Sequence, residues 1–135
     1  MVADETTDGV RLAQLLASEL TGDGDYLAHV SVTDADPDVE PTADGALAYR
    51  VRVDDSEDNE NSGHSTLAEA FVHPDRVRVE FARAPSVAVD AAREAGLRVR
   101  PKAVTPPRTL VFVEDGAQVK RVLPVFRAVV DADSE

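Results

Sequence analysis

Valine and arginine alternate in three separate stretches of the chain, and this period of two constrains the fold more than any other feature. The stretches are residues 46–53 (ALAYRVRV), 76–81 (RVRVEF) and 97–100 (LRVR). Successive side chains of an extended strand point to opposite faces, so the valines would face a core and the arginines would face solvent. The pattern therefore predicts strands of a sheet that has one apolar face and one charged face.

Further segments extend this predicted sheet. Residues 26–33 and 108–113 also have the pattern of strands. Residues 65–73 fit a strand or a helix, because Thr66 and Glu69 could form a capping box; we favour a strand, since it would complete a hairpin. In residues 46–53 the side chains expected to face the core are Leu47, Tyr49, Val51 and Val53.

Two segments carry clear signals for the start and end of a helix. Asp8 is a good N-cap for a helix over residues 9–21, and Gly22 would supply its left-handed stop. Pro85 suits a first helical turn and opens a short alanine-rich helix that Gly96 would close. We therefore expect one amphipathic helix near the start of the chain and a second one before residue 97.

The last third of the chain and the middle loop are less regular. Apolar residues at helical spacing favour a kinked helix over residues 117–130, interrupted by Pro124, with a strand as the alternative. The acidic segment 54–63 contains no apolar anchor, so we expect a mobile loop there. The tail 131–135 is expected to be frayed.

The order of these elements defines a fold class. A strand, a helix and a third extended segment follow one another across residues 76–101, which predicts a βαβ-like unit. The whole pattern predicts an α+β domain with a mostly antiparallel sheet of five or six strands and two or three helices packed on one face. At 135 residues the chain can bury one sizeable core, so we expect a single domain over residues 1–135.

The chain is strongly acidic, and its acids are unevenly distributed. It has 26 acidic residues against 14 basic ones and a formal net charge of -12; residues 1–63 hold sixteen acids and three bases. Carboxylate-rich surfaces keep proteins hydrated in molar salt, where a Debye length of about 3 Å screens their self-repulsion. The composition therefore predicts a salt-adapted protein of the cytoplasm, and this likeness to halophilic proteins is one of composition only.

Several classes of protein and site are disfavoured. There is no cysteine, which excludes a disulfide framework and a thiolate zinc site. The first ten residues are acidic where a signal peptide would be basic and then apolar, and no run approaches 18 apolar residues. We therefore expect neither export nor a membrane partner.

No catalytic pattern can be recognised among the nucleophiles and titratable residues. The serines lie in no G-x-S-x-G or S-x-x-K motif. On a helix Glu69 and His73 would stand at i and i+4 and could share a metal, but no second histidine lies on that turn, so we interpret His73 as a histidine that ends an element. The sequence thus assigns no catalytic residue, no metal and no cofactor.

A basic stretch near the C-terminus is the one candidate for binding. From residue 98 to residue 127 there are seven bases and two acids, and alternate side chains of the first five residues would stand about 7 Å apart on one side of a strand. Such a row could bind an anionic partner, or it could pair with acids of neighbouring strands. The candidates are Arg98, Arg100, Lys102, Arg108, Lys120 and Arg121.

Three functions from different classes are compatible with this row. The first is a non-enzymatic interaction or ligand-binding module, with an acidic protein or a second copy of the chain as partner; a valine-rich edge strand would invite such self-association. The alternative is a small enzyme that binds an anionic metabolite with these arginines and uses a carboxylate or His73 as general base. The third is contact with RNA, which the low aromatic content of 4% disfavours.

Overall fold

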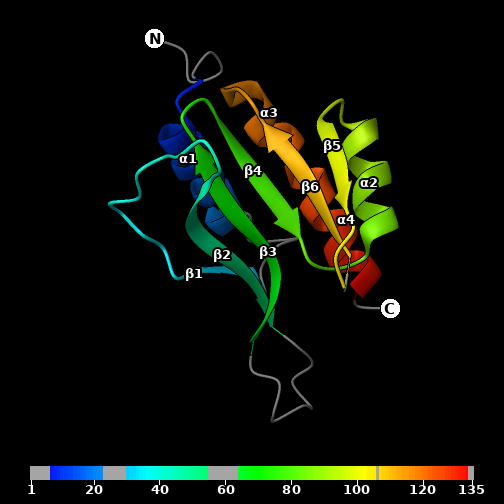
Figure 1. Ribbon diagram of the computed structural model, residues 1–135. Helices are drawn as coiled ribbons and strands as arrows, with labels where there is room; N and C mark the ends of the chain where they lie inside the picture. The colour runs from blue at the N-terminus through cyan, green and yellow to red at the C-terminus, as the bar shows by residue number, and fades with distance from the viewer. Residues whose placement is uncertain (1–6, 23–29, 55–63, 106, 134–135) are drawn as a thin grey trace.

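One antiparallel sheet of six strands forms the centre of the protein (Figure 1). The computed structural model describes residues 7–22, 30–54, 64–105 and 107–133. The strands lie side by side in the order β1-β2-β3-β4-β6-β5, and every neighbouring pair is antiparallel. The predicted α+β class is therefore confirmed. The strands are β1 (Val30–Thr33), β2 (Ala46–Asp54), β3 (His64–His73), β4 (Arg76–Phe81), β5 (Arg98–Lys102) and β6 (Arg108–Val113).

Helices pack on one face of this sheet. Helix α1 contacts β1, β3 and β4, whereas α2 contacts β5 and β6 and also packs against α4. In Figure 1 the central strands lie in front of α1 and α4, so the viewer looks onto the helix-free surface of the sheet, which we call the open face. The helical segments are α1 (Gly9–Gly22), α2 (Pro85–Glu94), α3 (Gly116–Arg121) and α4 (Leu123–Asp133).

Helix α1 begins where the sequence predicts. The Asp8 carboxylate accepts hydrogen bonds from the backbone N–H groups of Val10 and Arg11, at 3.0 and 3.3 Å, and so caps the helix. Gly22 is the last helical residue and does not adopt the left-handed conformation expected of it. The buried stripe of the helix consists of Leu12, Ala13, Leu16 and Leu20.

The predicted βαβ-like unit is present as a crossover that skips one strand. β4 and β5 both pair antiparallel with β6, so they are parallel to each other with β6 between them, and α2 connects them. Pro85 occupies the first turn of α2. Gly96 ends the connection in a left-handed conformation with φ of 76°, and the N–H of Leu97 then donates to the carbonyl of Ala92 at 3.0 Å.

Both segments with two alternatives adopt the favoured one. Residues 64–73 form β3, which pairs with β2 and with β4. The C-terminal segment is helical and is interrupted at Val122, between α3 and α4. Pro124 is tolerated because it is the second residue of α4, where a backbone N–H has no acceptor within the helix.

Strand β2 departs from strict alternation. Leu47 pairs with Phe71 but Tyr49 pairs with the next residue, Ala70, so the register shifts by one position between them. Ala48 and Tyr49 are consequently both buried, while Leu47 is only half-buried on the open face. The expectation that Leu47 faces the core is therefore wrong, because an extra residue in a bulge reverses the phase of all residues before it.

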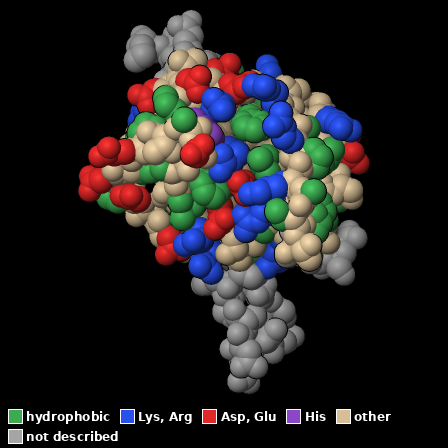
Figure 2. Space-filling view, in the orientation of Figure 1, with side chains coloured by type: hydrophobic (Ala, Val, Ile, Leu, Met, Phe, Trp, Pro, Cys, Tyr) green, Lys and Arg blue, Asp and Glu red, His purple; other side chains and the backbone are tan. Residues whose placement is uncertain are grey.

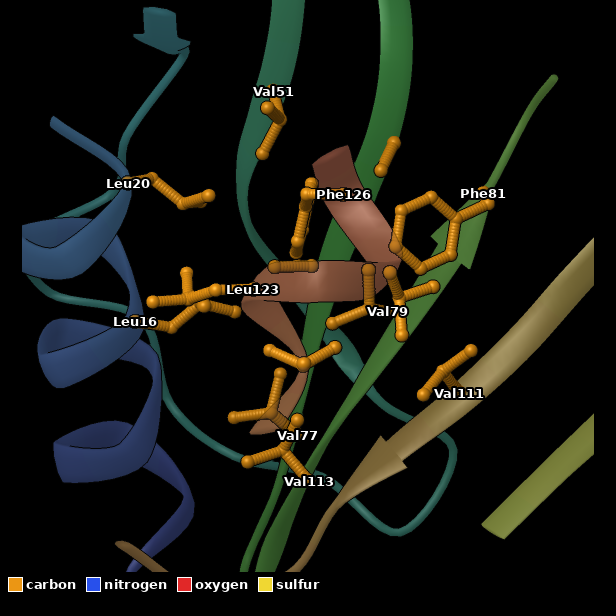
Figure 3. Close-up of a cluster of buried hydrophobic side chains, with 14 of the residues drawn as sticks. Leu16, Leu20, Val51, Val77, Val79, Phe81, Val111, Val113, Leu123 and Phe126 are labelled. Carbon is orange, nitrogen blue, oxygen red and sulfur yellow. The ribbon is translucent and has the colours of Figure 1, made fainter. Parts of the chain in front are cut away.

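The core lies between the sheet and the helices (Figure 3). The rings of Phe81 on β4 and Phe126 on α4 pack with centroids 4.7 Å apart. The hydroxyl of Tyr49 reaches α1 and donates to the carbonyl of Ala13 at 2.8 Å, and burial raises the pKa of this tyrosine. The alternating valines of β2, β4 and β6 fill the remaining space, as predicted from their period of two.

Two segments predicted to be irregular fall partly or mostly outside the described residues. The expected mobile loop at 54–63 lies there except for Asp54, the last residue of β2. The tail expected to be frayed is helical up to Asp133 in α4, and residues 134–135 lie outside the described ranges. Among the described helices, none has the length and apolar character needed to cross a membrane.

Candidate functional site

Four of the six candidate basic residues lie together on the open face. Arg98, Arg100 and Lys102 alternate along β5, and we call these three residues the basic row. Strand β6 lies beside them, and Arg108 is the direct cross-strand partner of Lys102. The row lies at the edge of the sheet because β5 is the last strand in the order.

The other two candidates, Lys120 and Arg121, lie in the helical layer. Both are exposed in the last turn of α3, where cations interact favourably with the negative end of the helix dipole. The structure thus separates them from the open face, and a structural role at the helix end is sufficient to explain them.

The members of the basic row differ in how they are paired. Arg98 donates to Glu114 at 2.7 Å, but its side chain keeps 69% of its surface exposed. The Lys102 ammonium lies 3.5 Å from Glu80. Arg100 is exposed and makes no hydrogen bond or ion pair with any residue in the described ranges. The middle of the row therefore carries a cation that is not neutralised within the described part of the chain.

On the central strands of the same face, two carboxylates are nearly buried and lie opposite each other. Glu69 on β3 and Glu80 on β4 are direct cross-strand partners, with side chains only 14% and 3% exposed. Like charges in this arrangement repel each other. Arg108 offsets this repulsion, because one of its guanidinium nitrogens lies between the two carboxylates, 2.7 Å from Glu69 and 3.2 Å from Glu80. Arg50 and Arg78 add further ion pairs, at 2.8 Å to Glu69 and 2.9 Å to Glu80 respectively.

The electrostatics of this cluster favour the charged forms. Burial opposes the ionisation of Glu69, but hydrogen bonds from Arg108 and Arg50 outweigh it and lower the pKa of this carboxyl. The hydrogen bond to Glu69 correspondingly raises the pKa of Arg108. Arg108 is thus held by internal acids, as the self-pairing interpretation of the basic stretch predicts, and a partner would have to compete with two carboxylates for it.

His73 lies at the end of β3 beside this cluster and is only 3% exposed. Its Nδ1 lies 3.0 Å from the Ala43 carbonyl, and its Nε2 lies 3.0 Å from a guanidinium nitrogen of Arg78. A guanidinium only donates, so Nε2 must accept and the proton sits on Nδ1. Burial lowers the pKa of His73, and the nearby Arg76 and Arg78 lower it further. His73 is therefore a neutral structural histidine.

A shared metal on Glu69 and His73 would require a helix, and these residues lie in a strand. Residues four apart on a strand are about 13 Å apart, too far to hold one ion together. Among the described residues no group of three or more His, Asp or Glu side chains could hold a metal.

Two phenylalanines on the open face were missed by sequence reasoning. Phe71 and Phe112 are half-buried there, and Arg78 lies over the ring of Phe71 at 4.5 Å. Arg76 and Arg98 flank Phe112 at 5.9 and 5.7 Å, within the range of cation–π contacts. The sequence did contain the evidence for their position. Each phenylalanine is next to a valine that must face the core, so its own side chain must point to the opposite, open face.

The charged groups of the open face have a clear spatial distribution (Figure 2). Lysine and arginine side chains gather over β4, β6 and β5, and hydrophobic side chains are visible among them. Acidic side chains project at the opposite edge, from the loop between β1 and β2. The arginines are spread across several strands, and those that converge, Arg50, Arg78 and Arg108, do so on Glu69 and Glu80, which pair with them. A shallow hollow lies elsewhere, between α1 and α4, where it is lined by Ser18, Glu19, Gly22, Leu123 and Arg127.

Comparison with known proteins assigns the chain to a family. All of its residues, 1–135, match the model of a Family of unknown function (DUF7993). The chain belongs to this family. No curated protein and no solved structure matches this chain.

Proposed function

We propose that this DUF7993 protein is a non-enzymatic binding module whose open face receives an acidic partner. The surface combines basic side chains with half-buried phenylalanines, which suits contact with a carboxylate-rich macromolecule. Its central charges are fixed in place by the buried Glu69 and Glu80, so little side-chain entropy would be lost there on binding.

The observation that carries this proposal is the state of Arg100. In a chain with a net charge of -12, this arginine is exposed and has no acidic partner among the described residues, although its neighbours in the row are paired. Abundant acids could have neutralised it, as they do Arg50 and Arg108. An unpaired cation between two paired ones, on the same face as half-buried phenylalanines, supports a role in binding.

The flat distribution of the arginines supports a binding surface over the enzymatic alternative. An enzyme acting on an anionic metabolite would gather its cations and a general base around a concave site. Here both ring nitrogens of His73 are already engaged in hydrogen bonds, one with the Ala43 carbonyl and one with the Arg78 guanidinium. The hollow between α1 and α4 is remote in the fold from the basic row.

The test is binding of defined polyanions, measured by fluorescence anisotropy in 0.5 M KCl. The probes are a labelled poly-aspartate peptide and a labelled single-stranded RNA of twelve nucleotides. We expect the wild-type protein to bind the peptide and Arg100→Glu to weaken binding at least tenfold. Arg93→Glu, on the exposed side of α2, is the charge-matched control and should bind like wild type.

Each outcome bears on a different function. Failure of the wild-type protein to bind either probe contradicts an anion-binding surface. Binding of RNA in preference to the peptide would support RNA contact, with Phe71 and Phe112 as stacking platforms. Equal losses in Arg93→Glu and Arg100→Glu would show that net charge alone, and not the basic row, controls binding.

We further propose that the protein works in the cytoplasm of a cell that holds molar salt. The support is the net charge of -12 and the scarcity of lysine. We expect the melting temperature to rise between 0.1 and 2 M KCl, because salt screens the repulsion among carboxylates. A melting temperature that does not change over this range contradicts salt adaptation.

A further inference from the structure

The two edges of the open face carry opposite charge. The segment between β1 and β2, residues 34–45, contains five acids and no base, and we call it the acidic loop. Its side chains at Asp38, Glu40 and Asp44 are exposed and form no ion pair with residues in the described ranges. The basic row lies at the other edge of the sheet, on β5. The surface is therefore divided into an acidic side and a basic side.

The acidic loop is held in a defined position against the sheet. Backbone hydrogen bonds join Asp36 to Ala48 at 2.8 Å and Thr42 to Val72 at 3.3 Å. Val39 packs against the hydrophobic core. Because the loop is anchored, its carboxylates are presented to solvent without a large entropy cost for ordering them later.

From this arrangement we infer that the acidic partner of the open face is the acidic loop of a second copy of the chain. This inference rests on the proposed binding function of the face. In Figure 1 the acidic loop and β5 lie at opposite edges of the sheet and at a similar height along the strands. A two-fold axis parallel to the strands, with two open faces opposed, places each acidic loop over the basic row of the other copy.

The centre of such a dimer has suitable chemistry. Between the two charged edges lie Leu47, Phe71, Leu110 and Phe112, all half-buried on the open face. The two-fold axis brings these apolar side chains together, beside the internally paired charges of Glu69, Glu80 and Arg108, while both contacts between the acidic loops and the basic rows form at the rim. The arrangement is closed by symmetry and does not continue into a fibre.

Pairing of sheet edges, the mode expected from the sequence, is opposed by the edge strands themselves. In the described part of the chain β1 is a short strand of four residues, Val30–Thr33. β5 contains Pro101, which lacks a backbone N–H, and it is flanked there by Arg100 and Lys102. The open face is therefore the better surface for self-association.

The test is a charge swap followed by sedimentation equilibrium. The wild-type chain in 0.5 M KCl should show a monomer–dimer equilibrium. Arg100→Glu alone and the double variant Asp38→Lys/Glu40→Lys alone should each weaken dimerisation roughly tenfold, since a dimer contains two copies of every contact. An equimolar mixture of the two variants should recover a heterodimer, because both of its contacts again join opposite charges.

The outcomes separate this inference from the proposed function. If the wild-type chain stays monomeric up to millimolar concentration but binds poly-aspartate through Arg100, the inferred dimer is contradicted and the proposed binding surface is still supported. A dimer that is unaffected by either variant, or a mixture that does not recover, also overturns it. The matched control Arg93→Glu should dimerise like wild type, and circular dichroism of each variant verifies that it is folded.

Discussion

Removal of the Arg108 side-chain charge is the most informative perturbation of the open face. In Arg108→Met the carboxylates of Glu69 and Glu80 lose the guanidinium that lies 2.7 and 3.2 Å from them. Two like charges about 5 Å apart on directly opposed strand positions repel each other by about 3 kcal/mol at an effective dielectric constant of about 20. Methionine keeps most of the packing volume, so the change isolates the charge.

The structure also limits the size of the effect. Glu80 keeps Arg78 at 2.9 Å and Lys102 at 3.5 Å, and Glu69 keeps Arg50 at 2.8 Å. These remaining cations shield part of the repulsion, so we expect a loss of about 2–3 kcal/mol in the free energy of unfolding. For a chain of this size that corresponds to a fall of about 6–10 °C in melting temperature.

Calorimetry in 2 M KCl measures this difference, and its pH dependence provides a second criterion. The pKa of Glu69 is lowered in the folded protein, so its contribution to stability is present above its unfolded pKa and is lost as the pH falls through the folded value. The gap between wild type and Arg108→Met should therefore be full near pH 7 and should shrink below about pH 4.

The controls test the assigned cause. Arg100→Met, on the same face but without an ion pair in the described structure, should change stability by less than about 0.5 kcal/mol. Adding Glu80→Gln to Arg108→Met should recover part of the loss, since it removes one of the two opposed charges. An Arg108→Met protein as stable as wild type at pH 7, or a gap that stays constant with pH, would refute the electrostatic argument.

Three further predictions concern stability and are measured by urea unfolding in 2 M KCl. Gly9→Ala should lower the free energy of unfolding by about 1–3 kcal/mol, because the added methyl group would overlap the carbonyl oxygen of His73 where α1 approaches the β3–β4 turn. A neutral effect would mean that the helix can shift. Asp8→Ala should lower the free energy of unfolding by about 1 kcal/mol, because the α1 cap is lost. Asp8→Asn should retain most of the capping stability. Equal losses in the two variants would indicate an effect of charge instead of capping. Because the pKa of His73 is lowered in the folded protein, the free energy of unfolding should decline as the pH falls below about 6.5. This decline should be smaller in His73→Gln. Identical pH profiles of the two proteins would contradict a buried neutral histidine.

The alternation of valine with charged residues was sufficient to predict most of the fold. It placed Val51, Val77 and Val79 in the core and predicted a sheet with one open face, because burial of one face imposes a period of two on the sequence. Local capping chemistry at Asp8, Pro85 and Gly96 likewise set the helix boundaries, since it depends only on residues close in the chain.

What the sequence could not predict depends on strand order and register. The opposed pair of Glu69 and Glu80 follows from the register between β3 and β4. Its bridge through Arg108 arises because β6 inserts between β4 and β5, a choice made by non-local packing. The bulge that turns Leu47 outward is equally invisible in a periodic pattern.

The sequence by itself thus determined the fold class, the core valines and the basic character of residues 98–108. Tertiary structure alone decided which cations are neutralised, since pairing depends on which strands become neighbours. It left Arg100 without an acidic partner in the described structure, removed Lys120 and Arg121 to the helical layer, and placed an acidic loop and a basic row at opposite edges of one surface.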